Sequence, residues 1–369
     1  MSQRSLDIVV STGEKLSCRF MTALLQDRGV KAKFVDLSEI ITFQARDHVD
    51  QVFYATLSNA LRATLTLPAS QPFVPVITGF FGPVPGGLLS QVGRGYTDLC
   101  AALVAVALSA SELQIWKEVD GIFTADPRKV PTARLLSDIT PAEAAELTFY
   151  GSEVIHPHTM EQVIRARIPI CIKNVFKPEG FGTRIVPDVL LNEAPELPPR
   201  QEAKKKPIAV TVKQNILVLN VHSNLFSIWR DRGFLERVFG ILNKHNLPNV
   251  DMVSTSQQEV SMALHSAGRL TDNNNKIISP NLAAAVKDLE EFGSVTHKDK
   301  MAILCLVGTH MKSQVGVSGR MYYVLGEHGV NIEMISQGAS EINISCVIGE
   351  RDANRAMNIL HTHLFTYYE

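Results

Sequence analysis

Apolar residues in the first half of the chain recur at two alternating spacings. Between residues 12 and 28 they return every three or four positions and Gly29 follows, a pattern that predicts a helix ending at that glycine. Residues 31–37 alternate apolar and polar side chains, as a half-buried strand does. Strands alternating with helices predict an α/β fold with a mostly parallel sheet and flanking helices. The succession continues with helices expected at 52–64, 97–108, 139–147 and from 156, and strands expected at 73–80, 112–119 and up to 175.

The composition changes near the middle of the chain. The segment 188–207, DVLLNEAPELPPRQEAKKKP, has four prolines, mixed charge and little periodicity. Such a composition is typical of an inter-domain linker. We therefore expect a first domain at 1–187 and a linker at 188–206.

The remainder of the chain contains an internal repeat. Residues 250–252 (VDM) match residues 332–334 (IEM), and Glu259 matches Glu341, at a constant offset of 82 residues. Each copy predicts a strand, a helix, two strands and a further helix, which is the βαββαβ plan of the ferredoxin-like fold. We expect two such modules, at 207–298 and 299–369.

Charge and cysteine content exclude several classes of protein. The net charge is −1, whereas a dedicated nucleic-acid-binding protein has a clear basic surplus. Five scattered cysteines without a CxxC pair indicate a reducing compartment. No apolar stretch has the length of a signal-peptide core or a membrane span. These features predict a protein of the cytosol that binds neither nucleic acid nor membrane.

The motif GRGYTD at 93–98 is the first candidate for chemistry. A glycine turn that leads into a helix presents free backbone N–H groups and the positive end of the helix dipole. Arg94 could direct its guanidinium at a carboxylate or a phosphate. Thr97 is expected to be the helix N-cap, and Asp98 suits the first turn. The pattern is equally that of a glycine-rich turn with a surface arginine and an ordinary cap.

Two further motifs place charged residues near the ends of elements. In WKEVDGIFTADPRKV, Lys117 and Glu118 end a strand and Arg128 follows in a basic loop, a position that suits a nucleotide in an α/β sheet. A solvated turn has the same composition. In STGEKLS, Glu14 either binds a cation or an amine or is an ordinary glutamate near a helix start. The histidines near residue 156 lack further ligands at metal-binding spacing, so we expect no protein metal site.

In this order and spacing the motifs resemble those of the aspartokinases, the ATP:L-aspartate phosphotransferases of the amino-acid kinase family, and most of all their fungal branch. The resemblance rests on SxGEKLS, GFFG, GRGYTDLCAAL, WKEVDGIFTADPRKV, GSEVIHPHTMEQVIRA and the paired VSTS and ISQGA segments. The repeats resemble ACT domains, small modules that bind amino acids as feedback sensors. The resemblance implies an amino-acid kinase domain followed by two ACT modules, and formation of β-aspartyl phosphate on the route to threonine and methionine.

The resemblance also implies roles for individual residues. Phosphoryl transfer depends mainly on positioning and charge neutralisation, which cations and helix dipoles provide. Glu14 would hold the α-ammonium group of aspartate, and Arg94 would grip a carboxylate. Further contacts to substrate or phosphate would come from Gly95, Tyr96, Thr97 and Asp98. The nucleotide, with its Mg²⁺, would contact Lys117, Glu118, Phe123, Arg128 and Glu153.

The chain departs from the family pattern in several places. Many bacterial members have GRGGSD where this chain has Tyr96 and Thr97, a Thr-Asp pair where it has Lys117 and Glu118, and a lysine where it has Glu153. No K-hydrophobic-G-G-T-S segment, whose lysine and amides would hold the transferred phosphate, precedes the first helix. We therefore expect a shortened N-terminus and low activity. The alternatives are a non-catalytic regulatory subunit, which binds effector and a full-length kinase, and a different amino-acid kinase.

An effector amino acid is expected to bind between paired ACT-like modules. It needs an acceptor for its ammonium group and backbone donors for its carboxylate. The loops at matching ends of the repeats offer both, although they could also be simple turns. The fungal likeness favours threonine, with lysine as the alternative. Because ACT modules of the family usually pair across subunits, we expect a dimer or larger homo-oligomer. The candidate effector residues are Asp231, Asp251, Ser256, Gln337 and Gly338.

Overall fold

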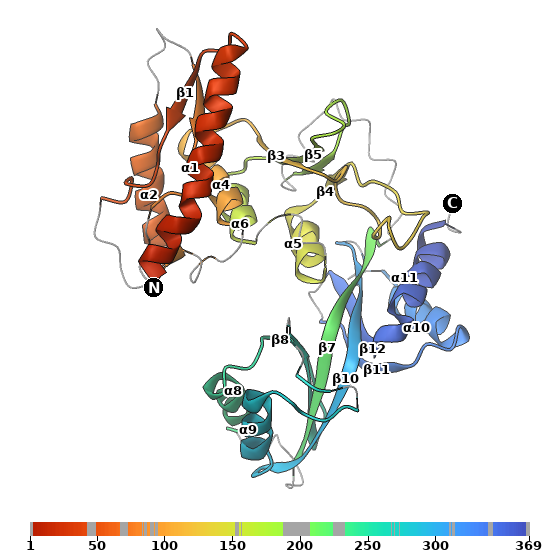
Figure 1. Cartoon of the computed structure of the whole chain (residues 1–369). Helices are drawn as coiled ribbons and strands as arrows, with labels where there is room; N and C mark the ends of the chain where they lie inside the picture. The colour runs from red at the N-terminus through yellow and green to blue at the C-terminus, as the bar shows by residue number, and fades with distance from the viewer. Residues whose placement is uncertain are drawn as a thin grey trace. The chain divides into compact units, whose positions relative to one another are not determined.

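Helices alternate with strands along the first half of the chain, as the apolar spacing predicted (Figure 1). The bounds are α1 Gln3–Asp27, β1 Ala32–Val35, α2 Gln51–Leu65, β2 Val74–Ile77, α4 Tyr96–Ala107, β3 Leu113–Lys117, β4 Asp138–Ile139, α5 Pro141–Phe149, α6 Pro157–Arg165, β5 Ile170–Asn174 and β6 Thr183–Ile185. Strands β1 and β2 form a parallel pair. A second sheet has the order β3-β5-β6-β4, in which β5 and β6 are antiparallel and the other neighbours parallel. The α/β class is confirmed, with the parallel strands divided between two sheets.

In the computed structural model, the chain divides into two compact units, and each is described by itself. The first unit comprises 1–122, 135–148 and 153–197, and the second comprises 123–134, 149–152 and 198–369. The expected linker at 188–206 and the candidates Arg94, Glu153 and Asp231 lie outside the described residues. The structure describes residues 3–42, 49–66, 73–82, 84, 87–88, 92, 95–151, 155, 157–186, 207–223, 233–266, 268, 270–272, 274–309, 311, 314–338 and 342–366.

One core of the first unit forms between α2 and α4. Leu57 and Leu61 of α2 and Leu99 and Leu103 of α4 are buried in a single cluster. Full burial of each leucine contributes about 1.5–3 kcal/mol relative to exposure. Asp50 caps α2, since its Oδ1 accepts a hydrogen bond from the backbone N–H of residue 53 at 2.8 Å. This packing holds α4, whose first turn contains Tyr96, Thr97 and Asp98 of the GRGYTD motif.

Helix α1 begins at Gln3, nine residues before the expected start. Its early turns contain Ile8, Val9 and Val10, which are 40–59% exposed. Their apolar character therefore does not follow the spacing of a buried face, which is why periodicity predicted only the later turns. Asp7 anchors this part of the helix, because its buried carboxylate accepts a hydrogen bond from Leu88 N at 2.7 Å.

The second half of the chain forms a six-stranded antiparallel sheet with the order β11-β12-β10-β7-β9-β8. Helices α8 and α9 contribute to one hydrophobic core, and α10 and α11 contribute to another. The sequence repeat thus corresponds to two packed modules. The bounds are β7 Ala209–Ser223, α8 Phe234–Lys244, β8 Val250–Thr255, β9 Glu259–His265, α9 Pro280–Leu289, β10 Gly293–Val307, α10 Val317–Glu327, β11 Ile332–Ser336, β12 Asn343–Gly349 and α11 Ala353–His361.

The two modules share the long strands β7 and β10. The C-terminal part of β7 pairs with the start of β10 in the first module, and residues 209–213 pair with 303–307 in the second. Between these parts the register shifts, and Asn215 and Lys300 adopt positive φ angles of 60° and 56°. The expected boundary at residue 298 therefore lies inside β10, and the start of β7 adds the fourth strand of the second module.

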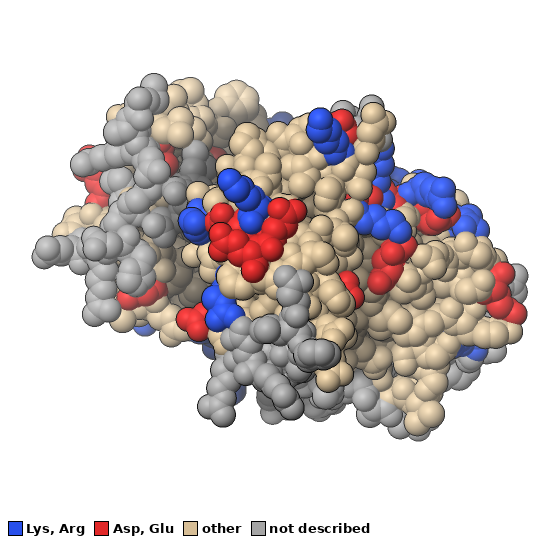
Figure 2. Space-filling view, turned by 90° about the horizontal axis from the view of Figure 1, so that it is seen from below, with Lys and Arg blue, Asp and Glu red and all other residues tan. Residues whose placement is uncertain are grey.

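Charged side chains are mixed on the face shown in Figure 2. Among the coloured residues of that face, acidic and basic groups are interspersed without a continuous basic area, in keeping with the net charge of −1. No helix within the described ranges combines the length and hydropathy needed to cross a bilayer.

Candidate active site and effector site

The candidate substrate site begins at the C-terminal ends of the parallel strands β1 and β2. Thr78 directly follows β2 and is buried. Its Oγ1 accepts a hydrogen bond from Leu37 N at 3.0 Å and donates to Phe80 O at 3.1 Å. These bonds join the loops that follow the two strands. Ligands of open α/β sheets bind at this edge.

The N-terminus of α4 lies next to the loop after β2, because a Cβ on Gly79 would be 2.6 Å from Thr97 Cγ2. The N-cap of α4 is Gly95, whose φ of 94° lies in the left-handed region that favours glycine. The expectation that Thr97 is the N-cap is wrong, because Gly95 starts the helix two residues earlier. Gly95 offers no side-chain acceptor to the N–H groups of the first turn, so these groups can bind an anion.

Glu14 of α1 faces this helix end. The hydroxyl of Tyr96 donates a long hydrogen bond of 3.5 Å to Glu14 Oε1. Burial, and after it the negative charge of Glu14, raises the pKa of Tyr96, of Cys18 and of Cys100, the last to about 12. Within the described part of the chain Glu14 has no ion-pair partner. Its charge is therefore available to a cation such as an ammonium group.

Lys117 brings a cation to the first turn of α4. It is the last residue of β3, and its Nζ lies 3.4 Å from Asp98 Oδ2. The two side chains are 28% and 25% exposed, so the ammonium group remains accessible. The backbone O of Lys117 accepts a hydrogen bond from Val175 N at 2.9 Å, which fixes the strand end. A phosphate at the helix N-terminus would be within the influence of this cation.

The first unit thus brings together Glu14, Tyr96, Thr97, Asp98 and Lys117, all of which sequence analysis had proposed. The arrangement offers a carboxylate to an ammonium group, N–H donors to a carboxylate, and a lysine to a phosphate. This alternation of charge suits a zwitterionic amino acid beside a phosphoryl donor.

The other nucleotide candidates are divided between the two units. Glu118 follows β3 in the first unit and is exposed, whereas Phe123 and Arg128 lie in 123–134, which belongs to the second. The Arg128 side chain is 88% exposed, and its Nε lies 3.1 Å from Asp126 Oδ1. Although burial acts to raise the pKa of Asp126, hydrogen bonds from Arg128 lower it, and Asp126 in turn raises the pKa of Arg128. The exposed guanidinium is available to a phosphate.

Asp251, the effector candidate on β8, is engaged by a residue that sequence analysis missed. Its side chain is 3% exposed, and Oδ2 lies 2.8 Å from Lys213 Nζ in an ion pair that is not an aligned hydrogen bond. Lys213 Nζ also lies 4.4 Å from the centre of the Phe149 ring, a cation–π contact. The only sequence signal for this contact is a lysine inside the apolar strand β7.

The remaining effector candidates lie at the ends of β8 and β11. Ser256 N donates to Glu259 O at 2.8 Å, and Ser256 Oγ accepts from Glu259 N at 3.1 Å, so this serine closes the β8–β9 turn. Gln337 and Gly338 directly follow β11, and Gln337 is exposed. Strands β8 and β11 contact each other, which brings candidates from the two repeats towards one region.

Asp251→Ala is expected to lower the free energy of unfolding by about 3–5 kcal/mol, because Lys213 would remain as a buried, unpaired charge. Chemical denaturation measures the loss. The double variant Lys213→Met/Asp251→Leu should recover most of it. Asp288→Ala is the control, since Asp288 pairs with Lys244 and His245 at the surface and its loss should change stability little. Equal midpoints for Asp251→Ala and Asp288→Ala would show that the buried pair is unimportant.

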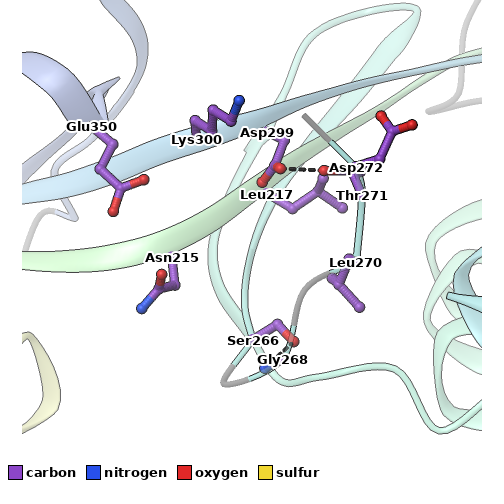
Figure 3. Close-up of a pocket in the computed structure, with 10 residues that line it drawn as sticks. All are labelled: Asn215, Leu217, Ser266, Gly268, Leu270, Thr271, Asp272, Asp299, Lys300 and Glu350. Atoms are coloured by element: carbon purple, nitrogen blue, oxygen red, sulfur yellow. Dashed lines mark hydrogen bonds between the residues drawn. The ribbon is translucent and has the colours of Figure 1, made fainter. Parts of the chain in front are cut away.

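A cavity of 240 Å³ lies beside the bulge of β7 and β10 (Figure 3). Thr271 Oγ1 donates a hydrogen bond to Asp299 on its wall. Backbone N–H groups of Lys276 and Asn274 donate to Asp272 and lower its pKa. None of the described effector candidates lines the cavity. The cavity is therefore distinct from the expected effector site.

Two protein-family models match the chain. The amino acid kinase family model matches residues 2–174, and an ACT domain model matches residues 304–364. Together with the fold and the charge arrangement at α4, these matches define an amino-acid kinase with ACT domains.

Similar proteins identify the family within this class. The aspartokinase of Saccharomyces cerevisiae is 52% identical over 379 residues, which cover 99% of this chain and 70% of that protein. The crystal structure of E. coli aspartokinase III in complex with aspartate and ADP has a TM-score of 0.76 at 31% identity, covering 99% of this chain and 77% of that one. The complex of E. coli aspartokinase III with lysine and aspartate has a TM-score of 0.73 at 30% identity, covering 99% and 76%. The chain belongs to the aspartokinase family, a family of phosphotransferases, which confirms the resemblance seen in its motifs.

Proposed function

We propose that the chain transfers the γ-phosphoryl group of ATP to the β-carboxylate of L-aspartate, giving 4-phospho-L-aspartate and ADP. The observation that supports this most is Glu14, which faces the open N-terminus of α4 with Lys117 beside it. A ligand with one ammonium and two carboxylate groups matches that alternation of charge. The E. coli relative solved with aspartate and ADP supports the same pair of ligands.

Catalysis of this reaction requires the site mainly to position its substrates, and less to activate them. The β-carboxylate is ionised at neutral pH, since its ordinary pKa is about 4, and therefore needs no general base. One of its oxygens attacks the γ-phosphorus while the bond to the β,γ-bridging oxygen breaks, and ADP leaves with the electron pair. The activation barrier comes mainly from the repulsion between two approaching anions. Cations and N–H dipoles lower this barrier.

Each candidate residue has a place in this scheme. Glu14 accepts hydrogen bonds from the α-ammonium group, and Arg94 binds a carboxylate. The first-turn groups of Gly95, Tyr96 and Thr97 bind the second carboxylate and the phosphate that forms on it. Lys117, linked to Asp98, neutralises the transferred phosphoryl group.

The remaining candidate residues bind the nucleotide. Glu118, Phe123, Arg128 and Glu153 contact ATP in this proposal. Mg²⁺ enters with ATP as part of the substrate. Among the described residues, no group of three or more His, Cys, Asp or Glu side chains is arranged to hold a metal ion of the protein itself.

An amino acid regulates the activity by binding at the ACT modules. The E. coli relative was solved with lysine, and the likeness to fungal members favours threonine for this chain. An effector ammonium group at Asp251 would replace Lys213, while Ser256, Gln337, Gly338 and Asp231 would complete the site. The modules pair across subunits in a dimer or larger oligomer, which light scattering measures. A rise in melting temperature with threonine or lysine tests the sensor, and no shift with either contradicts it.

The test of the activity is ATP-dependent formation of an acyl phosphate, trapped by hydroxylamine as the hydroxamate. Aspartate, glutamate and N-acetylglutamate are compared as acceptors with the same folded sample. We expect product with aspartate, at the low rate that the sequence analysis predicts, and inhibition by threonine. Product with glutamate or N-acetylglutamate instead would contradict the assigned acceptor, and no product with any of the three would contradict the activity.

A further inference from the structure

The segment 123–134, which contains the nucleotide candidates Phe123 and Arg128, is built into the second unit. Thr124 O accepts a hydrogen bond from Val210 N at 2.8 Å, next to the start of β7. Ala125 and Val130 are buried in the same core as α10 and α11. The scaffold of this segment is therefore the second ACT module.

His361, the last residue of α11, is fully buried and binds this segment through both ring nitrogens. Nε2 lies 2.8 Å from Thr124 Oγ1, and Nδ1 lies 3.1 Å from Thr132 Oγ1. Thr124 Oγ1 also accepts a hydrogen bond from Arg134 N at 2.9 Å. The neutral tautomer with a proton on Nδ1 satisfies all of these groups, because Thr124 then donates to Nε2 and Nδ1–H donates to Thr132.

Other contacts of the same helix end reinforce this junction. The His361 ring stacks on Phe365 with a centroid distance of 5.0 Å and an angle of 11° between the planes. Arg134 Nη2 donates to Phe365 O at 2.7 Å, and Asn358 Nδ2 donates to Lys129 O at 2.8 Å. The beginning, middle and end of the segment are thus each bonded to α11 or the turn after it.

We propose that His361 is a positioning residue for nucleotide binding, which acts through Thr124 and Thr132 to hold the segment that presents Phe123 and Arg128. This inference rests on the proposed function, which assigns those two residues to ATP. An apolar side chain could fill the space of the imidazole. It would leave two threonine hydroxyls without their partner, and the segment would gain alternative conformations.

Three variants test the role. His361→Leu removes both hydrogen bonds, whereas His361→Gln keeps a polar group that can reach Thr124. Leu289→Ala is the control for stability, because Leu289 is fully buried in the core of α8 and α9, away from the segment. We expect the KM for ATP to rise about tenfold in His361→Leu, which corresponds to the loss of roughly one net hydrogen bond. The KM for aspartate should change less than about twofold on the same scale, His361→Gln should recover most of the loss, and Leu289→Ala should leave the KM for ATP unchanged.

Two readouts that need no catalytic turnover complete the experiment, and the second of them also needs no bound nucleotide. Calorimetric titration of ADP with Mg²⁺ should show the same loss of affinity in His361→Leu, and trypsin should cleave after Arg128 and Lys129 faster than in Leu289→Ala. Equal changes in KM for both substrates, or unchanged ADP affinity with unchanged cleavage, would overturn the positioning role. If the unaltered chain neither transfers phosphate nor binds ADP, the proposed function fails, and the cleavage rates alone decide whether His361 orders the segment.

Discussion

Gly79→Ala is expected to lower kcat/KM for aspartate by about 100-fold or more, since an ångström-scale displacement of a substrate-binding group has effects of that order. A Cβ at residue 79 would lie 2.6 Å from Thr97 Cγ2 and 3.1 Å from Glu14 Oε2. Because Thr97 Cβ would also lie only 3.0 Å away, rotation of the Thr97 methyl group cannot relieve the clash, and the anion-binding helix end would shift relative to Glu14. Steady-state kinetics with aspartate varied at saturating ATP measures the effect.

Two further variants separate this effect from a general loss of stability. Gly13→Ala changes the neighbour of Glu14, but its Cβ would meet nothing within 4 Å. Alanine is about 1 kcal/mol better than glycine inside a helix, so this variant should be stabilised with unchanged kinetics. The double variant Gly79→Ala/Thr97→Ser lacks the Thr97 methyl group with which the new Cβ would clash, so it should recover part of the activity. If Gly79→Ala kept the kinetics of Gly13→Ala, the close approach of α1, α4 and the loop after β2 would not matter for catalysis.

Lys117→Met is expected to lower kcat by about 10²–10³-fold, the usual cost of removing one group that stabilises transition-state charge. The variant removes the cation next to the first turn of α4 and leaves Asp98 without its ion-pair partner. Lys117→Arg should retain part of the rate because it keeps the positive charge. Turnover at saturating substrates is the measurement.

Lys177→Met is the matched control for this charge change. Lys177 pairs with Asp120 at 3.0 Å, as Lys117 pairs with Asp98, but its side chain is 68% exposed and it is not one of the candidate site residues. Its kinetics should be those of the unaltered chain. A kcat for Lys117→Met within a few-fold of the Lys177→Met value would remove Lys117 from the proposed phosphate site.

Much of the fold followed from spacing alone, because the elements of the first half are amphipathic or fully buried. The strand at 31–37 and the helix at 52–64 correspond to β1 and α2 with shifts of a few residues. The early start of α1 was missed because Ile8–Val10 are exposed and break the periodicity of a buried face. The N-cap of α4 was misplaced because Gly95 caps the helix through its left-handed backbone conformation. Such a cap has no sequence signal other than the glycine, whereas Thr97 has the side chain of an ordinary N-cap.

Contacts between distant parts of the chain were not predictable from local patterns. Thr124 and His361 are 237 residues apart, and each alone has an ordinary sequence context. The Lys213–Asp251 pair joins two strands that are separated in the sheet by β9. Local propensity indicates which residues are buried, whereas the choice of polar partners depends on how the finished elements pack. The residues that sequence analysis missed belong to this class of contact.

The proposed function depends most on Glu14, which faces the N-terminus of α4 and would bind the ammonium group of the substrate. Calorimetric titration of L-aspartate and of succinate, which has both carboxylates but no ammonium group, against the unaltered chain and Glu14→Gln tests it most directly. We expect the unaltered chain to prefer aspartate by at least about 10-fold, the value of one charge-assisted hydrogen bond. This preference should disappear in Glu14→Gln while succinate affinity is retained. An aspartate preference that survives the substitution would show that Glu14 does not bind the ammonium group.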